Sequence, residues 1–166
     1  MTDVKSLSAR IRDRVSLDWL TPSEQMVWEQ LLRFSGPPHG VVNIFGLEGV
    51  GKSFLGWLLE REQLATYSMW HHPPRPVHPR IVLDNARTER QEVRGIRPLV
   101  DKLGLQQIIL LSRRRVDEEF MPAFELRVTN DDIEHFAATL YRYLGVMIEE
   151  SDYPNYHAAL ASLDRS

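Results

Sequence analysis

Short apolar runs alternate along this chain with segments whose apolar residues recur every three or four positions. A short apolar run is typical of a strand buried in a parallel sheet, whereas the wider spacing is typical of a helix with one apolar face. A segment rich in Thr and Tyr also favours a strand. These patterns predict strands at residues 41–45, 65–70, 81–85, 107–112 and 124–128.

The segments between these strands carry helical signals. Thr21-Pro22-Ser23-Glu24 combines an N-cap threonine, a proline at the first helical position and a glutamate at the third, so a helix should begin there. Apolar stripes predict further helices over residues 52–62 and 87–103, the second with arginines on its opposite face, and one more after Thr129-Asn130. The tail from Ser151 is short and polar, with room for a helical turn or two.

This alternation predicts an α/β protein with a mostly parallel sheet, helices on both faces and right-handed crossovers. The length of 166 residues and the 43% hydrophobic content suit one globular domain with a sizeable core. We expect an N-terminal extension over residues 1–20, the domain over residues 21–150 and a C-terminal tail over residues 151–166.

A phosphate-binding motif follows the first predicted strand. Gly46-Leu47-Glu48-Gly49-Val50-Gly51-Lys52-Ser53 has the G-x-x-x-x-G-K-[ST] form, in which glycines let successive backbone N–H groups point at an anion and the following helix adds its positive end. We expect Lys52 to reach the β- and γ-phosphate oxygens and Ser53 to occupy one position on Mg²⁺. With Phe54 as a further contact, this loop predicts nucleotide binding in a three-layer P-loop NTPase fold.

Asp84 stands at the end of the strand predicted at residues 81–85. In parallel α/β sheets, ligands bind at the carboxyl ends of the strands, where this carboxylate would lie. We expect Asp84 to hold Mg²⁺ through a water molecule beside Ser53. The alternative is an aspartate that caps a following helix, and the phosphate loop favours the metal role.

Charge and composition set the compartment and the candidate surfaces. No apolar run is long enough to cross a bilayer, residues 1–20 do not resemble a secretory signal, and there is no cysteine, so we expect a cytoplasmic protein without disulfides. Residues 75–115 carry a charge of +6 and residues 116–166 a charge of −8. This asymmetry indicates surfaces for different partners, head-to-tail self-association, or simply solvated helix faces.

A loop rich in proline and histidine is predicted at residues 71–79, where four prolines exclude a helix and an interior strand. Three histidines in this tract allow a metal site, but the tract holds no cysteine or carboxylate, and a stiff chain wraps a small ion poorly. We favour a solvated loop that covers the nucleotide or contacts a partner.

The phosphate loop looks like the G-x-G-G-V-G-K-T loop of the STAND and NB-ARC ATPases, relatives of AAA+ proteins in the additional-strand branch of P-loop NTPases, with Glu48 in place of a glycine. Residues 108–113 are similar to the apolar strand that ends in T-[TS]-R in those proteins, and residues 124–132 to their last core strand and the start of an acidic helix. The resemblance covers residues 23–147. It implies a strand between the phosphate-loop strand and the acidic strand, and it implies that Arg113 senses the γ-phosphate.

Departures from that family pattern change the expected activity. Members that hydrolyse ATP often place an acidic residue directly after the magnesium aspartate, and this chain has Asn85. An amide cannot accept a proton from water at neutral pH, so we expect slow hydrolysis or binding without turnover. The chain also lacks the lid domain and the adenine-contacting proline motif of the family. We therefore expect one open face of the nucleotide, covered by a protein partner or a second copy.

Three functions are compatible with these features. The first is an ATP-binding, slowly hydrolysing switch or assembly module, with Lys52, Asp84, Asn85 and Arg113 as the catalytic set. The absence of a guanine-reading N/T-K-x-D motif favours ATP. The second is a small-molecule or nucleotide kinase in which Arg113, Arg114 and Arg115 clamp phosphates, although no acidic pair is placed to activate an acceptor. The third is a nucleic-acid-linked ATPase that uses the basic middle segment.

Overall fold

The computed structural model describes residues 4–34, 40–71, 75, 77–116, 118, 121–148 and 153–164. Residues 72–74 and 76 of the predicted His/Pro loop and residues 151–152 and 165–166 of the predicted tail lie outside these ranges. Within the described ranges, every helix is too short or too polar to cross a membrane.

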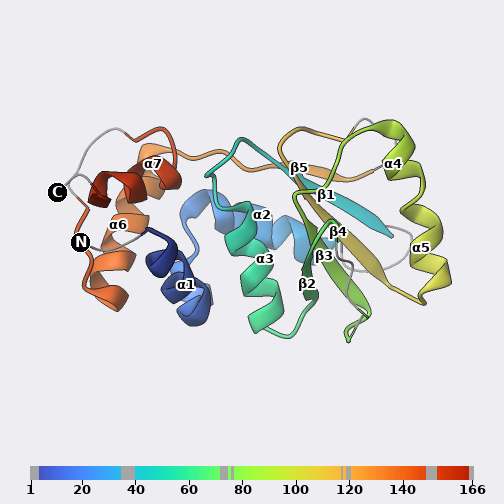
Figure 1. Ribbon diagram of the computed structural model, residues 1–166, viewed down its shortest axis with the longest axis horizontal. Helices are drawn as coiled ribbons and strands as arrows, with labels where there is room; N and C mark the ends of the chain where they lie inside the picture. Colours follow the sequence, from blue (N-terminus) through green and yellow to red (C-terminus); the bar gives the residue numbers. More distant parts are fainter. Residues whose placement is uncertain are drawn as a thin grey trace.

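The described residues form a sheet of five parallel strands in the order β2-β3-β4-β1-β5 (Figure 1). The strand bounds are β1 (Val41–Phe45), β2 (Thr66–Met69), β3 (Arg80–Asp84), β4 (Gln107–Ser112) and β5 (Ala123–Glu125). The predicted α/β class and the strand expected at residues 65–70 are confirmed. Strand β4 lies between β1 and β3, which is the order that the resemblance implied.

Helices cover both faces of this sheet (Figure 1). On one face, α2 (Pro22–Arg33) and α3 (Lys52–Arg61) pack against Val42, Ile109 and Leu111 in one apolar cluster. On the other face, α4 (Arg90–Arg94) and α5 (Arg97–Lys102) pack near Ile108 and Leu110 in a second cluster. Successive residues of a strand point to opposite faces, so the apolar runs of these strands supply both cores.

Two predicted elements differ in the structure. The helix predicted over residues 87–103 is broken into α4 and α5, because Pro98 has no N–H for the carbonyl of Arg94 and its ring clashes with that turn. The strand predicted over residues 124–128 ends at Glu125. Its partner β1 ends at Phe45, so the chain beyond has no neighbouring strand with which to continue the ladder.

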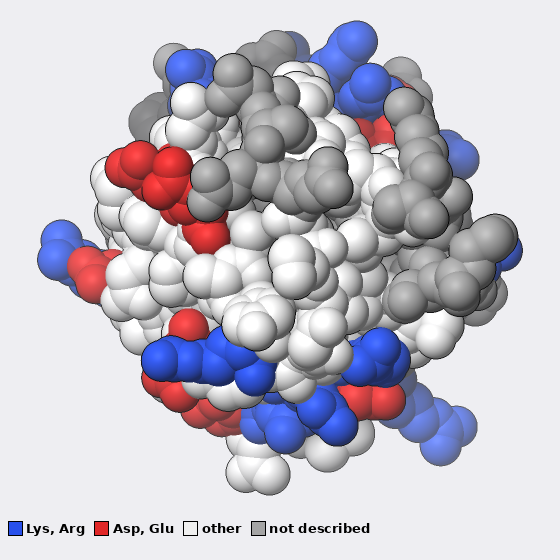
Figure 2. All heavy atoms as spheres, turned by 90° about the vertical axis from the view of Figure 1, so that its left-hand side faces the viewer, with Lys and Arg blue, Asp and Glu red and all other residues white. Residues whose placement is uncertain are grey.

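A third cluster joins the two ends of the chain beside the sheet. It unites α1 (Val4–Arg14), the short 3-10 helix η1 (Leu17–Trp19), α6 (Asn130–Leu144) and α7 (Tyr156–Ala161), and a second 3-10 helix, η2 (Ser162–Asp164), follows α7. Leu7, Ile11, Trp19, Leu140 and Leu160 are buried in it. Figure 2 shows this end of the molecule, where uncharged residues occupy the middle and charged side chains lie toward the margin.

The carboxylate of Asp132 connects this helical cluster to helix α2. It accepts hydrogen bonds from the backbone N and the hydroxyl of Ser23 in α2, at 2.8 and 2.7 Å, and from the backbone N and the hydroxyl of Thr129, at 2.7 and 2.8 Å. The N-termini of α2 and α6 are therefore held together by one buried carboxylate.

Candidate functional site

The loop between β1 and α3 has a backbone path that requires glycine at two positions. Gly49 and Gly51 have φ angles of 79° and 94°, in the left-handed region that residues with a Cβ rarely enter. At Gly51 a Cβ would also meet the Glu24 carboxyl group. Gly46 has no positive φ, but the backbone carbonyl of Leu126 lies against it, so there too the chain leaves no room for a side chain.

Lys52 lies across the mouth of this loop. Its ammonium nitrogen donates to the carbonyl oxygens of Gly46 and Leu47 at 2.7 and 2.6 Å. Burial lowers the pKa of Lys52, against the opposing effect of the carboxylates of Asp84 and Glu48. Bound phosphate oxygens would replace the two carbonyls as acceptors and give the half-buried ammonium a charged partner.

Asp84 and Ser53 lie next to each other, as the sequence predicted. The Ser53 hydroxyl donates to Oδ2 of Asp84 at 2.6 Å, the Tyr67 hydroxyl donates to the same oxygen at 2.5 Å, and the backbone N of Asn85 donates to Oδ1 at 2.7 Å. The Asp84 side chain is buried and caps no following helix, since the N-cap residue of α4 is Glu89. Asn85 itself has a φ of 54° and is exposed at the pocket.

The Ser53 hydroxyl and the Asp84 carboxylate fit a magnesium ion by their chemistry. Both are oxygen donors, and Mg²⁺ is commonly held by one or two protein oxygens together with water and phosphate oxygens. The described residues contain no group of three histidine, cysteine or carboxylate side chains that could hold a metal ion. Burial, with the bond to Asp84 as a second cause, raises the pKa of Tyr67 far above its ordinary value, so its hydroxyl stays a donor to this carboxylate.

The loop after β4 is held by Asn43, a fully buried amide in the middle of β1. Its Nδ2 donates to the Ser112 hydroxyl at 2.8 Å, and its Oδ1 accepts from the backbone N of Val116 at 2.9 Å. The Ser112 hydroxyl in turn donates to the carbonyl of Arg114 at 2.7 Å. Sequence reasoning missed Asn43, although a lone amide inside an apolar run was a visible signal.

Of the three predicted phosphate-clamping arginines, Arg113 lines the pocket, and its charge further lowers the pKa of Lys52. Arg114 and Arg115 are exposed and are not among the lining residues. The arrangement therefore brings Arg113 to the site without its two neighbours.

A cavity of about 530 Å³ adjoins the phosphate loop. Glu48, Gly49, Gly51, Lys52 and Ser53 line its polar end, together with Asp84, Asn85 and Arg113, and the predicted contact Phe54 lines its apolar wall. Of the other predicted loop contacts, Leu47 is exposed and Val50 is buried in the core, and neither side chain reaches the cavity. An apolar and aromatic wall continues from the loop and consists of Ile11, Trp19, Phe54, Trp57, Phe136, Tyr156 and Leu160.

The wall of this cavity corrects our expectation of an open nucleotide face. Helices α1, α6 and α7 of the same chain supply it, and α7 docks directly on the loop, because the backbone N of Tyr156 donates to the carbonyl of Gly49 at 3.0 Å. The hydroxyls of Tyr156 and Thr21 are 2.8 Å apart and share a hydrogen bond. These helices therefore supply part of the cover that we expected from a partner or a second copy, and that partner stays a prediction. The first and last helices lack the signature of a known lid, so the sequence did not reveal this cover.

Glu24 is a second buried carboxyl group at the loop, and sequence reasoning had treated it only as a capping residue. Its Oε2 accepts from the backbone N of Thr21 at 3.0 Å, as in a capping box, while the side chain lies against Gly51. Burial raises the pKa of Glu24 to about 8. Near neutral pH the group is therefore mostly uncharged, and it adds little repulsion to a bound anion.

Comparison with known proteins places the fold. No protein-family model and no curated protein sequence matches the chain. Among solved structures, AMPPCP-bound DnaA from Aquifex aeolicus matches with a TM-score of 0.62 and 13% identity over 88% of this chain. Replication initiator DnaA bound to AMPPCP and single-stranded DNA matches with a TM-score of 0.57 and 16% identity over 86% of this chain. The crystal structure of a DNA replication initiation factor matches with a TM-score of 0.60 and 14% identity over 86%.

These likenesses show the fold, and they agree with the predicted α/β P-loop architecture. The chain spans 62%, 59% and 59% of the three matched chains, so a large part of each has no counterpart here. Two of these three structures are of DnaA, and the finer resemblance to STAND and NB-ARC proteins stays a prediction.

Proposed function

We propose that this protein binds ATP with Mg²⁺ and acts as a slowly hydrolysing, nucleotide-dependent switch. One observation carries the proposal. A glycine loop covered by Lys52, a hydrogen-bonded Ser53–Asp84 pair and an apolar cavity lie together at one edge of the sheet. Two of the matched structures hold AMPPCP, an ATP analogue, on the same fold.

Each part of ATP has a complementary part of the site. The triphosphate lies along the loop, where N–H groups, the start of α3 and Lys52 offset its charge. The Ser53 hydroxyl and the Asp84 carboxylate would hold a magnesium ion, which would supply positive charge against the phosphates. The base lies against the aromatic wall, where Trp19 and Phe136 offer apolar surface. Arg113 lies on the side from which it can contact the terminal phosphate.

Slow turnover follows from Asn85. This residue lines the cavity directly after Asp84, and its amide can orient a water molecule but cannot take its proton. The carboxylate of Asp84 already accepts three hydrogen bonds, and Glu24, which lies against Gly51 and also lines the cavity, is mostly protonated near neutral pH. Asn85 and protonated Glu24 are therefore poor general bases for a water at the terminal phosphate, and the one acceptor position left on Asp84 is assigned to the magnesium ion and its water. The same reasoning disfavours the kinase alternative, which needs a base for an acceptor hydroxyl.

The switch acts through α7. Its contact with the carbonyl of Gly49 makes the position of α7 depend on the loop, and α7 shares an apolar cluster with α1 and α6. A loop that reorganises around phosphate thereby changes the packing of the helical cluster, which controls association with a protein partner or a second copy. Gel filtration with ATP or with ADP tests whether the nucleotide controls this association. The same elution volume with both nucleotides, for the protein alone and for the protein with a partner, would contradict it.

Stabilisation by nucleotide tests the binding itself. A ligand that binds only the folded state raises the free energy of unfolding by RT ln(1 + [L]/Kd), so ATP with Mg²⁺ should raise the melting temperature of the wild type. Lys52→Ala should reduce this increase, while Lys102→Ala, which removes an exposed lysine of α5, should retain it in full. Equal stabilisation of both variants would contradict the assigned role of the loop.

Turnover across a series of protein concentrations tests the hydrolytic part. A turnover number that stays low and constant fits a site completed within one chain, as the wall of the cavity indicates. A turnover number that rises with protein concentration would show instead that an arginine from a second copy completes the site.

Single-stranded nucleic acid is a second candidate ligand. One matched structure is of DnaA bound to single-stranded DNA, and the segment over residues 75–115 is basic. Contacts with phosphates release counterions, so such binding must weaken as salt rises. Fluorescence anisotropy with a labelled oligonucleotide at two salt concentrations tests it, and an anisotropy unchanged by the protein at low salt would dismiss direct binding.

A further inference from the structure

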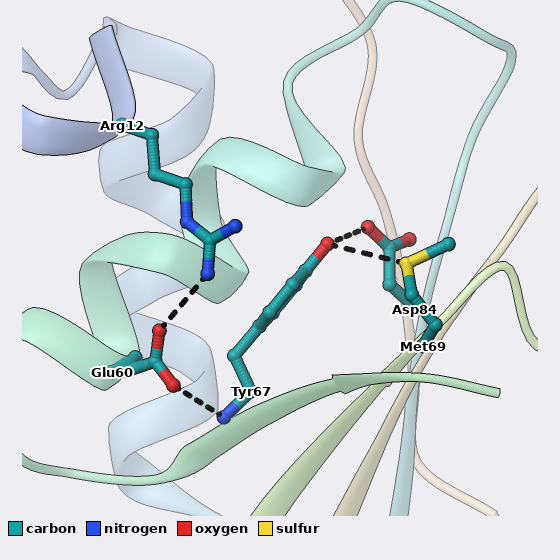
Figure 3. Close-up of polar contacts among 5 residues, drawn as sticks. All are labelled: Arg12, Glu60, Tyr67, Met69 and Asp84. Atoms are coloured by element: carbon teal, nitrogen blue, oxygen red, sulfur yellow. Dashed lines mark hydrogen bonds and ion pairs between the residues drawn. The ribbon is translucent and has the colours of Figure 1, made fainter. Parts of the chain in front are cut away.

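Tyr67 reaches the phosphate site from the edge strand β2 (Figure 3). Its ring packs over α3 at Gly56, where a Cβ would lie 2.7 Å from the ring carbon Cδ2. Glycine is a poor residue for the interior of a helix, and here it leaves the space through which the ring passes. The half-buried tyrosine thereby reaches across α3 toward Asp84.

The hydrogen bonds at Asp84 fill one carboxylate oxygen and leave the other partly open. Oδ2 accepts from both Tyr67 and Ser53, at 2.5 and 2.6 Å, and Oδ1 accepts from the backbone N of Asn85 at 2.7 Å. Each carboxylate oxygen has two lone pairs, so one acceptor position remains, on Oδ1. The Tyr67 hydroxyl thus determines which oxygen is available to a water molecule on a metal ion.

Tyr67 also contacts the N-terminal helix α1, through the side chain of Arg12 (Figure 3). The guanidinium of Arg12, in α1, lies 5.5 Å from the Tyr67 ring centroid and 5.9 Å from that of Trp57. Arg12 also pairs with the Glu60 carboxylate at 3.5 Å, and the other oxygen of Glu60 accepts from the backbone N of Tyr67 at 3.3 Å. The docking of α1 therefore supports the position of the ring.

We infer that Tyr67 is a positioning residue for the magnesium ion of a bound nucleoside triphosphate, because it fixes the orientation of the Asp84 carboxylate. This role rests on the proposed function, and none of the sequence motifs pointed to it. A tyrosine hydroxyl with a purely structural task would stabilise the fold without changing how strongly magnesium assists nucleotide binding. That difference makes the two roles separable.

The test uses Tyr67→Phe, which removes the hydroxyl and keeps the ring on Gly56 and beneath Arg12. Affinity for AMPPCP is measured by calorimetry with Mg²⁺ and again with EDTA, for the full chain. We expect the gain in affinity due to Mg²⁺ to fall by roughly tenfold, the equivalent of one hydrogen bond to a charged group, with the EDTA affinity unchanged. Met69→Leu is the matched control, because the Met69 sulfur lies 3.8 Å from the same hydroxyl. We expect this substitution to leave the magnesium effect intact.

The outcomes separate this inference from the proposed function. A magnesium effect in Tyr67→Phe that equals or exceeds the wild-type effect would overturn the positioning role and leave ATP binding standing. An equal loss with and without Mg²⁺ would also overturn it, since that result marks a general structural defect. If the wild type binds no AMPPCP at all, the proposed function fails, and the role of Tyr67 fails with it. Arg12→Ala should give a smaller loss of the same kind, because Arg12 supports Tyr67, through its ring and through Glu60, and does not contact Asp84.

Discussion

Replacing Glu24 by glutamine should remove a pH dependence from the stability of the protein. Burial raises the pKa of Glu24 from the ordinary value of 4.5 to about 8, and the nearby charge of Asp132 adds to this effect. Between these two pH values the folded protein holds a proton on Glu24 that the unfolded chain has lost. The free energy of unfolding therefore decreases as pH rises through this window, and the contribution levels off above pH 8.

The size of the effect follows from the same two values. Each pH unit inside the window changes the free energy of unfolding by about 1.36 kcal/mol per proton. The window of about 3.5 units, from 4.5 to 8, therefore corresponds to at most roughly 5 kcal/mol. Glutamine cannot ionise, and its amide oxygen can still accept the bond from the backbone N of Thr21. Relative to the wild type, the variant should gain stability steadily as the pH rises from 5 to 8.

Urea unfolding at pH 5, 6, 7 and 8 measures this difference, with the buried Trp19 and Trp28 as fluorescence reporters. Glu29→Gln is the matched control, because it changes an exposed glutamate of the same helix. Other ionisable groups contribute equally to wild type and variant, so they cancel in the difference. If Glu24→Gln and the wild type lose stability in parallel across this range, the buried, protonated state that we assign to Glu24 is wrong.

Two further predictions concern buried polar anchors. Asn43→Ala should destabilise the protein by about 1–3 kcal/mol, because it leaves buried groups unpaired. It should also weaken the preference for ATP over ADP, because it loosens the loop that carries Arg113. Urea unfolding and paired titrations with ATP and ADP check the two effects, and an unchanged preference would contradict the second. Although burial alone would raise the pKa of Asp132, hydrogen bonds from Ser23 and Thr129 lower it, so its contribution is present above pH 3.8 and lost as the pH falls further. Asp132→Asn should therefore lower the free energy of unfolding at pH 7 by roughly 1.5–3 kcal/mol, and Asp131→Asn, an exposed neighbour, should not.

The sheet and the phosphate loop were predictable because their signals are local. An apolar run is typical of a buried strand whatever surrounds it, and the glycines of the loop are needed for conformations that the backbone adopts within a few residues. The pairing of Ser53 with Asp84 was predictable for another reason, because the carboxyl ends of parallel strands meet at one edge of the sheet. Pro98 was also visible in the sequence, but our prediction of one helix over residues 87–103 followed the apolar stripe alone.

The remaining features depend on contacts between distant segments. Leu7, Ile11 and Val15 recur every four residues in a highly charged segment. Only the structure shows that Leu7 and Ile11 pack with α6 and α7, that Val15 packs in the cluster of α2 and α3, and that Ile11 lines the cavity. Tyr67 could not be assigned a role from sequence, because its contact with Asp84 requires both the adjacency of β2 and β3 and the missing side chain at Gly56. These are tertiary relations that no local pattern encodes.

Calorimetric titration of the purified protein with ATP and Mg²⁺, in parallel with Lys52→Ala, tests the central claim most directly. We predict one ATP bound per chain by the wild type, and an affinity for the variant that is lower by roughly tenfold to a hundredfold, since Lys52 would lose charge-assisted bonds to phosphate. Lys102→Ala should titrate like the wild type. Absence of ATP binding by the wild type, or equal affinity in Lys52→Ala, would contradict the account.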